Sequence, residues 1–261
     1  MAKFGNYTGI QIDIQDHVAT LEVCRPPHNF LEIGLMEQIA SAYEALDKER
    51  DCRAIVLCAQ GKNFCAGNDF SRPDADVTNT SAAKYPLYAI GARLFATSKP
   101  SVAAVQGAAI GGGLGLALAA DFRVAAPSTR VSANFVLLGL HQGFGITFTL
   151  PRVVGQQQAL RMLYTGRRYT GTEGYQMGLF DELVPEEQLR QRAWDLAREI
   201  AIAAPLAVQS VRATMRRGIF DEYVRTTDHE SAEQMRLRAT ADFKEGVLSV
   251  SERRMGRFRA Q

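Results

Sequence analysis

Two short runs of consecutive apolar residues constrain the fold of this chain more than any other feature. AIVLCA occupies residues 54–59 and SVAAVQG occupies residues 101–107, each after a segment with helical spacing of apolar residues. A strand with one solvated face alternates apolar and polar residues, so runs that are apolar throughout indicate strands buried on both faces. Repeated strand and helix units in this order predict an α/β fold, either a right-handed β-α superhelix or a doubly wound sheet.

The segments on either side extend this order. Residues 8–24 alternate apolar and polar side chains around Gln15-Asp16-His17, which predicts an antiparallel hairpin. Beyond about residue 155 the apolar spacing is helical in one segment after another. We therefore predict two domains, an α/β core at residues 1–200 and an all-α region at residues 201–261. The further elements expected are helices at 31–50 and 85–96 and a strand at 122–126.

Composition and charge exclude several classes of protein. The formal net charge of +2 over 261 residues is spread along the chain, without the basic block typical of nucleic-acid or membrane-surface binding. No run approaches the roughly 18 apolar residues of a membrane span, and the N-terminal residues lack an apolar signal-peptide segment. The four histidines have no metal-ligand spacing and the four cysteines form no CxxC pair. We therefore expect reduced thiols, no metal site and a cytoplasmic location.

The segment AAIGGGLGLALAADF, residues 108–122, contains three consecutive glycines in front of an apolar helical run. Each glycine costs about 1 kcal/mol relative to alanine inside a helix. Bare backbone at a helix N-terminus lets an anion approach N–H groups that have no intrahelical partner. Gly111, Gly112 and Gly113 therefore leave three interpretations open: a phosphate site, an oxyanion site at a reacting carbonyl, or close packing of helix on sheet.

A second glycine-containing turn favours the oxyanion interpretation. NFCAGND, residues 63–69, also follows a buried strand, and we expect the N–H groups of Ala66-Gly67-Asn68 to face the same point. Asp69 is expected to accept backbone N–H bonds and brace this turn. A phosphate site has less support, because no GxGxxG follows the first strand and helix and no Gly-Lys-Ser/Thr follows the glycines.

At these two segments the chain resembles the crotonase superfamily, the enoyl-CoA hydratase/isomerases. GKNFCAGND and VQGAAIGGGLGLALAADFRVA are similar to its two signature blocks, and the similarity covers nearly the whole chain. Three further blocks stand in the family's order: RPPHNFL, LPRVVGQQQALRMLYTGRRYTGTEGYQMGLFDELVP and DFKEGVLSVSERRMGRF. The resemblance implies a β-β-α superhelix, that is, a spiral core with an all-α C-terminal trimerisation region, and homotrimers or dimers of trimers.

In that family two backbone N–H groups polarise the thioester carbonyl of an acyl-CoA and stabilise the enolate that forms. Matching positions assign these donors to Asn68 and Gly112. Coenzyme A is part of the substrate, so the resemblance implies no separate cofactor. It places the CoA moiety near Arg25, Asn29, Lys62, Ala66 and Phe258, and the acyl group in an apolar wall with Phe135, Leu138 and Phe144, together with Leu137 and Phe148.

The hydratases of this family use two glutamates, and this chain has neither. The matching positions are Gly115, one helical turn after Gly112, and Phe135. Other branches use an aspartate, and the matching positions here are Gly143 and Phe144.

Few side chains remain as candidates for proton transfer. His141 either acts as a general acid/base or packs as a satisfied loop residue. Asn134 either forms a hydrogen bond with a substrate or stabilises a turn. Asp74 and Asp76 of SRPDADV either enter the site or lie in a solvated acidic loop.

Three functions are consistent with this pattern. The first is an enzyme that processes an acyl-CoA through an enolate, which we favour because an intact oxyanion site indicates chemistry at a carbonyl. The second is a non-catalytic acyl-CoA-binding or regulatory protein. The third is a carbon-carbon bond hydrolase of the same fold.

Overall fold

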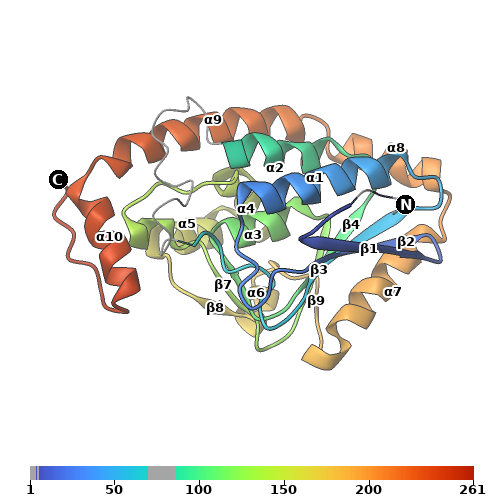
Figure 1. The fold of residues 1–261 in the computed structure, drawn as a ribbon, viewed down its shortest axis with the longest axis horizontal. Coiled ribbons are helices and arrows are strands. Elements are labelled where there is room, and N and C mark those ends of the chain that lie inside the picture. The colour runs from blue at the N-terminus through green and yellow to red at the C-terminus, as the bar shows by residue number, and fades with distance from the viewer. Residues whose placement is uncertain (1–3, 5, 70–85) are drawn as a thin grey trace.

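A computed structural model of the chain describes residue 4 and residues 6–69 and 86–261 (Figure 1). Asp74 and Asp76 lie outside these residues. The strands are β1 (Ile10–Gln15), β2 (Val18–Val23), β3 (Ala54–Ala59), β4 (Ser101–Val105), β5 (Ala108–Ile110), β6 (Phe122–Ala125), β7 (Arg130–Ser132), β8 (Tyr169–Thr170) and β9 (Glu182–Leu183). The helices are α1 (Ile33–Lys48), α2 (Pro86–Ala96), α3 (Gly112–Ala119), α4 (Ile146–Val154), α5 (Gln156–Thr165), α6 (Gly171–Gln176), α7 (Leu189–Ala201), α8 (Pro205–Met215), α9 (Ile219–Arg238) and α10 (Ala241–Ser251), with 3-10 turns at Asn134–Leu138 and Glu186–Gln188.

The main sheet of the described residues has six strands in the order β1-β2-β3-β4-β6-β9. β1 and β2 form the predicted antiparallel hairpin, and every other neighbouring pair is parallel. All residues of β3 and β4 are buried, as the apolar runs predict. The α/β fold is therefore confirmed. The short strands β5, β7, β8 and β9 were not foreseen: β5, just before the glycines, pairs with β7 in a second, three-stranded sheet that also includes β8.

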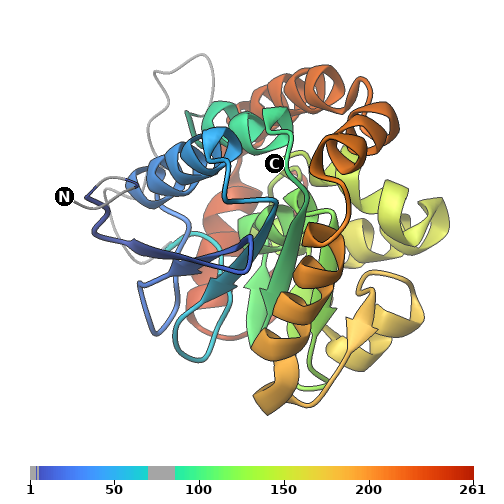
Figure 2. The same ribbon diagram turned by 90° about the vertical axis from the view of Figure 1, so that its right-hand side faces the viewer.

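Helices cover both faces of the main sheet. α1 and α2 lie side by side over one face, and α7 packs against the other face along β2, β3, β4 and β6 (Figures 1 and 2). The buried residues of α1 recur at helical spacing, for example Leu35, Ile39, Tyr43 and Leu46, so one stripe of the helix faces the core. The strands with apolar residues on both faces are the ones between these helix layers.

The C-terminal helices share the core of the α/β part. α9 packs against α2 and α4, and Tyr223 of α9 is fully buried, its ring stacked on Phe95 of α2 with centroids 4.2 Å apart. The boundary at residue 200 stays a prediction. No helix of the described residues is long and apolar enough to cross a membrane. The same residues contain no group of three metal-ligating side chains.

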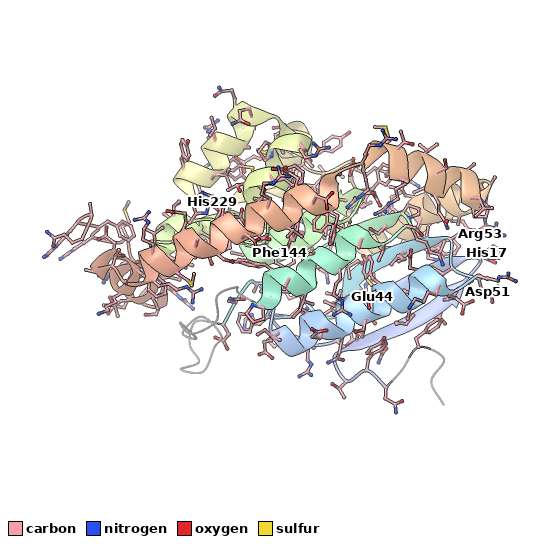
Figure 3. The ribbon with its side chains drawn as sticks, turned by 90° about the horizontal axis from the view of Figure 1, so that it is seen from above. His17, Glu44, Asp51, Arg53, Phe144 and His229 are labelled. Atoms are coloured by element: carbon pink, nitrogen blue, oxygen red, sulfur yellow. The ribbon has the colours of Figure 1, made fainter. Side chains whose placement is uncertain are left out.

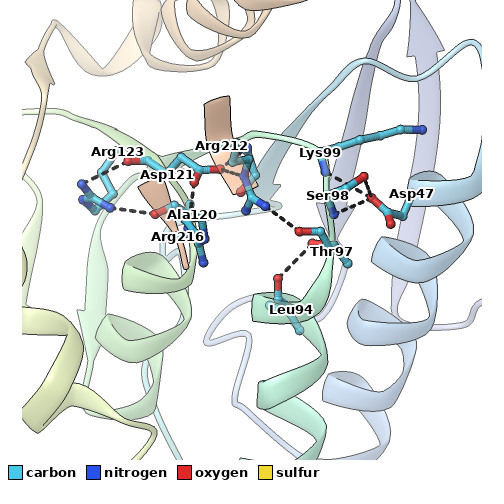
Figure 4. Close-up of polar contacts among 11 residues, drawn as sticks. Asp47, Leu94, Thr97, Ser98, Lys99, Ala120, Asp121, Arg123, Arg212 and Arg216 are labelled. Atoms are coloured by element: carbon cyan, nitrogen blue, oxygen red, sulfur yellow. Dashed lines mark hydrogen bonds and ion pairs between the residues drawn. The ribbon is translucent and has the colours of Figure 1, made fainter. Parts of the chain in front are cut away.

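Asp121, at the start of β6, holds α8 to the sheet with two ion pairs (Figure 4). Its carboxylate accepts from Arg212 Nε at 2.9 Å, from Arg216 Nη1 at 2.8 Å and from the backbone N–H of Ser101 at 2.8 Å. Burial lowers the pKa of Arg216, and the Asp121 carboxylate opposes this effect by stabilising the charged guanidinium. A buried cation of this kind depends on its partner.

We expect Asp121→Ala to lower the free energy of unfolding by about 3–5 kcal/mol, because both arginines then remain buried without a counter-charge. Urea unfolding followed by circular dichroism measures this loss. The control is Glu222→Ala, which removes an exposed pair with Arg225 and should cost less than about 1 kcal/mol. Equal losses in the two variants would contradict the assigned role of Asp121.

Candidate active site

The site is built where two loops meet at the carboxyl ends of β3 and β4. The loop that ends in Asn68 and the segment that leads to Gly112 are joined by an isolated parallel bridge between Cys65 and Ala109. Three backbone hydrogen bonds connect them: Phe64 N–H to Gln106 O at 2.9 Å, Cys65 N–H to Ala108 O at 2.9 Å, and Ile110 N–H to Cys65 O at 3.0 Å. These bonds bring the turn at Asn68 and the N-terminus of α3 to one place.

The backbone conformation and surroundings of Gly111, Gly112 and Gly113 differ. Gly111 precedes the helix with φ +54° and ψ −118°, a conformation that favours glycine. A Cβ on Gly113 would lie 2.2 Å from the carbonyl oxygen of Cys65, so this glycine permits the close approach of α3 to the other loop. A Cβ on Gly112 would meet only the end of the Leu31 side chain, at 2.9 Å. Close packing therefore explains Gly113, whereas Gly111 and Gly112 line a cavity.

The cavity has a volume of about 420 Å³ and two different ends. Its inner end is formed by buried or half-buried side chains from α2 and the 3-10 turn: Leu87, Tyr88, Phe135 and Leu138. Its mouth carries exposed basic side chains: His28, Lys62, Arg130 and Arg168. No Asp or Glu is among the described residues that line it. The cavity therefore suits a ligand with an apolar end and an anionic end.

Nine of the candidate site residues named from the sequence line this cavity. They are Lys62, Ala66, Gly67, Asn68, Gly111, Gly112, Asn134, Phe135 and Leu138. The structure places the other predicted site residues, Arg25, Asn29, His141, Phe144 and Phe258, outside its lining.

Phe144 points into the core and not into the cavity, which corrects its expected place in the acyl wall. The residue is fully buried and has φ +58°, an uncommon value for a residue with a side chain. Its ring fills the space beside Gly115, where a Cβ would lie 2.7 Å from Phe144 Cδ1. Figure 3 shows Phe144 between α2 and α9. A longer side chain at residue 115 would have to displace this ring.

The loop around Phe144 is held by a buried carboxylate. Glu230 of α9 accepts from Gly145 N–H at 2.7 Å, Thr147 N–H at 3.2 Å and Thr147 Oγ1 at 2.6 Å. These groups stand at the N-terminus of α4, where a carboxylate caps free N–H groups. Burial raises the pKa of Glu230, and the hydrogen bonds from Thr147 and Gly145 oppose the rise. Glu230 is not among the cavity-lining residues, so its role here is to fix the loop.

His141 also turns away from the cavity. Its Nδ1 lies 2.9 Å from the carbonyl oxygen of Gln142, and its ring packs edge-on to His229 of α9 with centroids 5.8 Å apart. Figure 3 shows His229 on the part of α9 nearer α10. Of the two interpretations of His141, the packed loop residue fits this geometry.

Asn29 supports the loop that ends in Asn68 through hydrogen bonds, and Arg25 contacts Asn29 through its backbone N–H. The buried Asn29 amide accepts from Arg25 N–H at 2.9 Å and donates to the carbonyls of Gln60 at 2.9 Å and Asn63 at 2.6 Å. The Arg25 guanidinium lies near Gly9 and Thr8 instead of the cavity. Phe258 packs on Gly256 in the C-terminal segment and is 43% exposed. Leu137 points outward, and Phe148 packs on the core.

Several cavity residues were missed by sequence reasoning. Tyr88 belongs to the predicted helix at 85–96, where no motif distinguishes it from a core residue. Arg130 and Arg168 occur in PSTRVS and TGRRYTG, and their charge was the available signal. Val250 of α10 reaches the cavity because Gly246 and Gly139 allow α10 to pack directly on the 3-10 turn.

The four cysteines are free thiols, as expected. Cys65 lies in the loop beside the cavity, and burial raises the pKa of its thiol to about 12. A protonated thiol is a poor nucleophile at neutral pH, so Cys65 has a packing role.

The fold and this site define a member of the crotonase superfamily. The family model for enoyl-CoA hydratase/isomerase matches residues 13–261, and the chain belongs to this family. It is 32% identical over 259 residues to a crotonyl-CoA hydratase of Syntrophomonas wolfei, covering 97% of this chain and 98% of the relative. It is 33% identical to the probable enoyl-CoA hydratase EchA14 of Mycobacterium tuberculosis, covering 88% and 90%.

Solved structures give the same result. The fold matches an enoyl-CoA hydratase/isomerase from Pseudoalteromonas atlantica with a TM-score of 0.86 and 28% identity, covering 97% of this chain and 100% of that one. The chain therefore belongs to a family whose named relatives are enoyl-CoA hydratases.

The contact between Gly113 and Cys65 yields a test of the site's construction. Gly113→Ala should lower stability by about 1–3 kcal/mol, because the new Cβ overlaps a backbone oxygen that cannot move alone. The control is Gly34→Ala in α1, where a Cβ meets nothing within 4 Å and alanine should stabilise by about 0.5–1 kcal/mol. Thermal unfolding of both variants measures whether the changes in stability have opposite signs. If Gly113→Ala left the stability unchanged, the close packing of Gly113 on Cys65 would be refuted.

Proposed function

We propose that this protein is an enzyme that binds an acyl-CoA thioester and stabilises its enolate between the backbone N–H groups of Asn68 and Gly112. The observation that carries the proposal is the bridge between the two loops, which brings both residues to the wall of one cavity. Gly112 is the first residue of α3, so its N–H has no acceptor within the helix and lies at the positive end of the helix dipole. Such donors stabilise negative charge that develops on a carbonyl oxygen.

The two ends of the cavity support the same ligand class. Leu87, Phe135 and Leu138 provide apolar contacts for an acyl group, and the basic mouth suits the phosphates of coenzyme A. Lys62, Arg130 and Arg168 are the lysine and arginine side chains of that mouth. No separate cofactor is needed for this binding.

Hydration through two glutamates is not part of the proposal. The positions where the family resemblance places them hold Gly115 and Phe135. The Phe144 ring occupies the space beside Gly115, and the Phe135 ring lies 3.5 Å from the Cβ position of Gly111. The enzyme would therefore use its oxyanion site with a different proton-transfer group.

A second candidate is a non-catalytic acyl-CoA-binding protein, and the absence of a carboxylate from the described cavity lining favours it. A carbon-carbon bond hydrolase is a third candidate, with less support because the C-terminal block is retained. We also propose a homotrimer or a dimer of trimers, since α8 exposes Leu206, Val211 and Met215, each more than 60% accessible.

Replacing Gly112 by proline tests the oxyanion site directly. Proline removes the N–H but is tolerated at the first position of a helix. We expect Gly112→Pro to abolish the shift of the thioester carbonyl stretch that bound crotonyl-CoA shows in an infrared difference spectrum. Any turnover on a panel of enoyl-CoAs should fall by about 10²–10³-fold, the usual effect of losing one oxyanion donor.

The matched control is Gly112→Ala, which adds a Cβ at the same place but keeps the N–H. It should retain the carbonyl shift, since the Cβ meets only the mobile end of Leu31. An unchanged shift in Gly112→Pro, or no binding of crotonyl-CoA by the wild-type protein, would reject the proposed site. If crotonyl-CoA binds with a carbonyl shift but no enoyl-CoA of the panel gives a product, the non-catalytic candidate is favoured.

A further inference from the structure

Tyr88 is the one residue with an ionisable side chain at the inner end of the cavity among the described lining residues. The other ionisable lining side chains, His28, Lys62, Arg130 and Arg168, are exposed at the mouth, whereas Tyr88 is 5% exposed. It stands on α2 beside Leu87, on the wall that also includes Leu138. In the proposed complex, a phenol at this place lies near the acyl end of the thioester.

The packing of α2 turns Tyr88 toward α3. Tyr88 and Gly91 are three residues apart and therefore share one face of the helix. A Cβ on Gly91 would lie 3.0 Å from Phe144 Cζ, and a Cβ on Gly115 of α3 would lie 2.7 Å from Phe144 Cδ1. The Phe144 ring thus fills the gap between the two helices and meets the Tyr88 ring edge-on, at 6.3 Å between centroids. Tyr88 therefore lines the cavity next to the ring that fills the space beside Gly115.

Two further contacts fix the hydroxyl. A Cβ on Gly143 would lie 1.9 Å from Tyr88 Oη, so the hydroxyl takes the space of a side chain at residue 143. Tyr88 Oη donates to Gln234 Oε1 at 2.9 Å. Gln234 Nε2 donates to the carbonyl oxygen of His141 at 2.9 Å, which sets the orientation of the amide. Gln234 is 3% exposed, so this arrangement is fixed by packing as well as by hydrogen bonds.

We propose that Tyr88 is the catalytic residue that delivers a proton to the α-carbon of the bound thioester enolate; this rests on the proposed function. The electron pair of the enolate forms the new C–H bond, the Oη–H bond breaks, and the phenolate then takes a proton from water. A phenol, with an ordinary pKa of about 10, is a stronger acid than the α-carbon of a thioester, so transfer in this direction is favourable. Gln234 is a positioning residue that holds the hydroxyl until the enolate forms.

Hydrogen exchange at the α-carbon isolates this step. Butyryl-CoA is incubated with the full-length protein in D₂O, and deuterium at the α-carbon is followed by mass spectrometry, with the Kd measured in parallel by calorimetry. By microscopic reversibility the group that delivers the proton also removes it. We expect Tyr88→Phe to exchange about 10²-fold or more slowly with a Kd within threefold of wild type.

The matched control is Tyr164→Phe, which makes the same change on an exposed side chain of α5 outside the cavity. It should exchange at the wild-type rate. Wild-type exchange by Tyr88→Phe, or binding of butyryl-CoA by the wild-type protein without exchange, would overturn the role of Tyr88 and leave the oxyanion site standing. Absence of butyryl-CoA binding by the wild-type protein would instead overturn the proposed function, and the role of Tyr88 with it.

Discussion

The bridge between Cys65 and Ala109 is the contact on which the rest of the site depends. β3 and β4 are neighbours in the sheet, but their loops would separate beyond the strand ends without the three backbone bonds that continue the pairing. Gly113 permits this approach, because a side chain there would overlap the Cys65 carbonyl. The glycine therefore contributes to function through the position of its neighbours, while the helix-terminal N–H comes from Gly112.

A second constraint comes from the C-terminal helices. Tyr223 and Glu230 of α9 hold the loop that carries Phe144, and Phe144 in turn fills the space between α2 and α3. The packing behind the cavity is thus assembled from segments about 85 residues apart in sequence. The Phe144 ring occupies the space that a side chain at residue 115 would take.

The sequence predicted the elements and the two loops well, because local patterns determine them. Alternation fixed the hairpin, apolar runs fixed β3 and β4, and the glycines marked the loops. The directions in which the Phe144 and His141 side chains point could not be predicted, because they depend on contacts with helices that are distant in sequence, such as α9. Tyr88 escaped notice for the same reason: in a helix with apolar periodicity, a cavity-lining tyrosine has the same local pattern as a core tyrosine such as Tyr43.

The contact of α10 with the 3-10 turn has a consequence for how the cavity is completed. Gly246 lies against the backbone of Leu138, and this brings Val250 of the same chain to the cavity. The C-terminal helix therefore contributes to the lining of the cavity within the same chain. Leu138 lines the cavity and also touches α10, so the shape of the cavity is linked to the position of a helix more than 100 residues away in sequence. A side chain at residue 246 would therefore act on the cavity through the backbone of the turn.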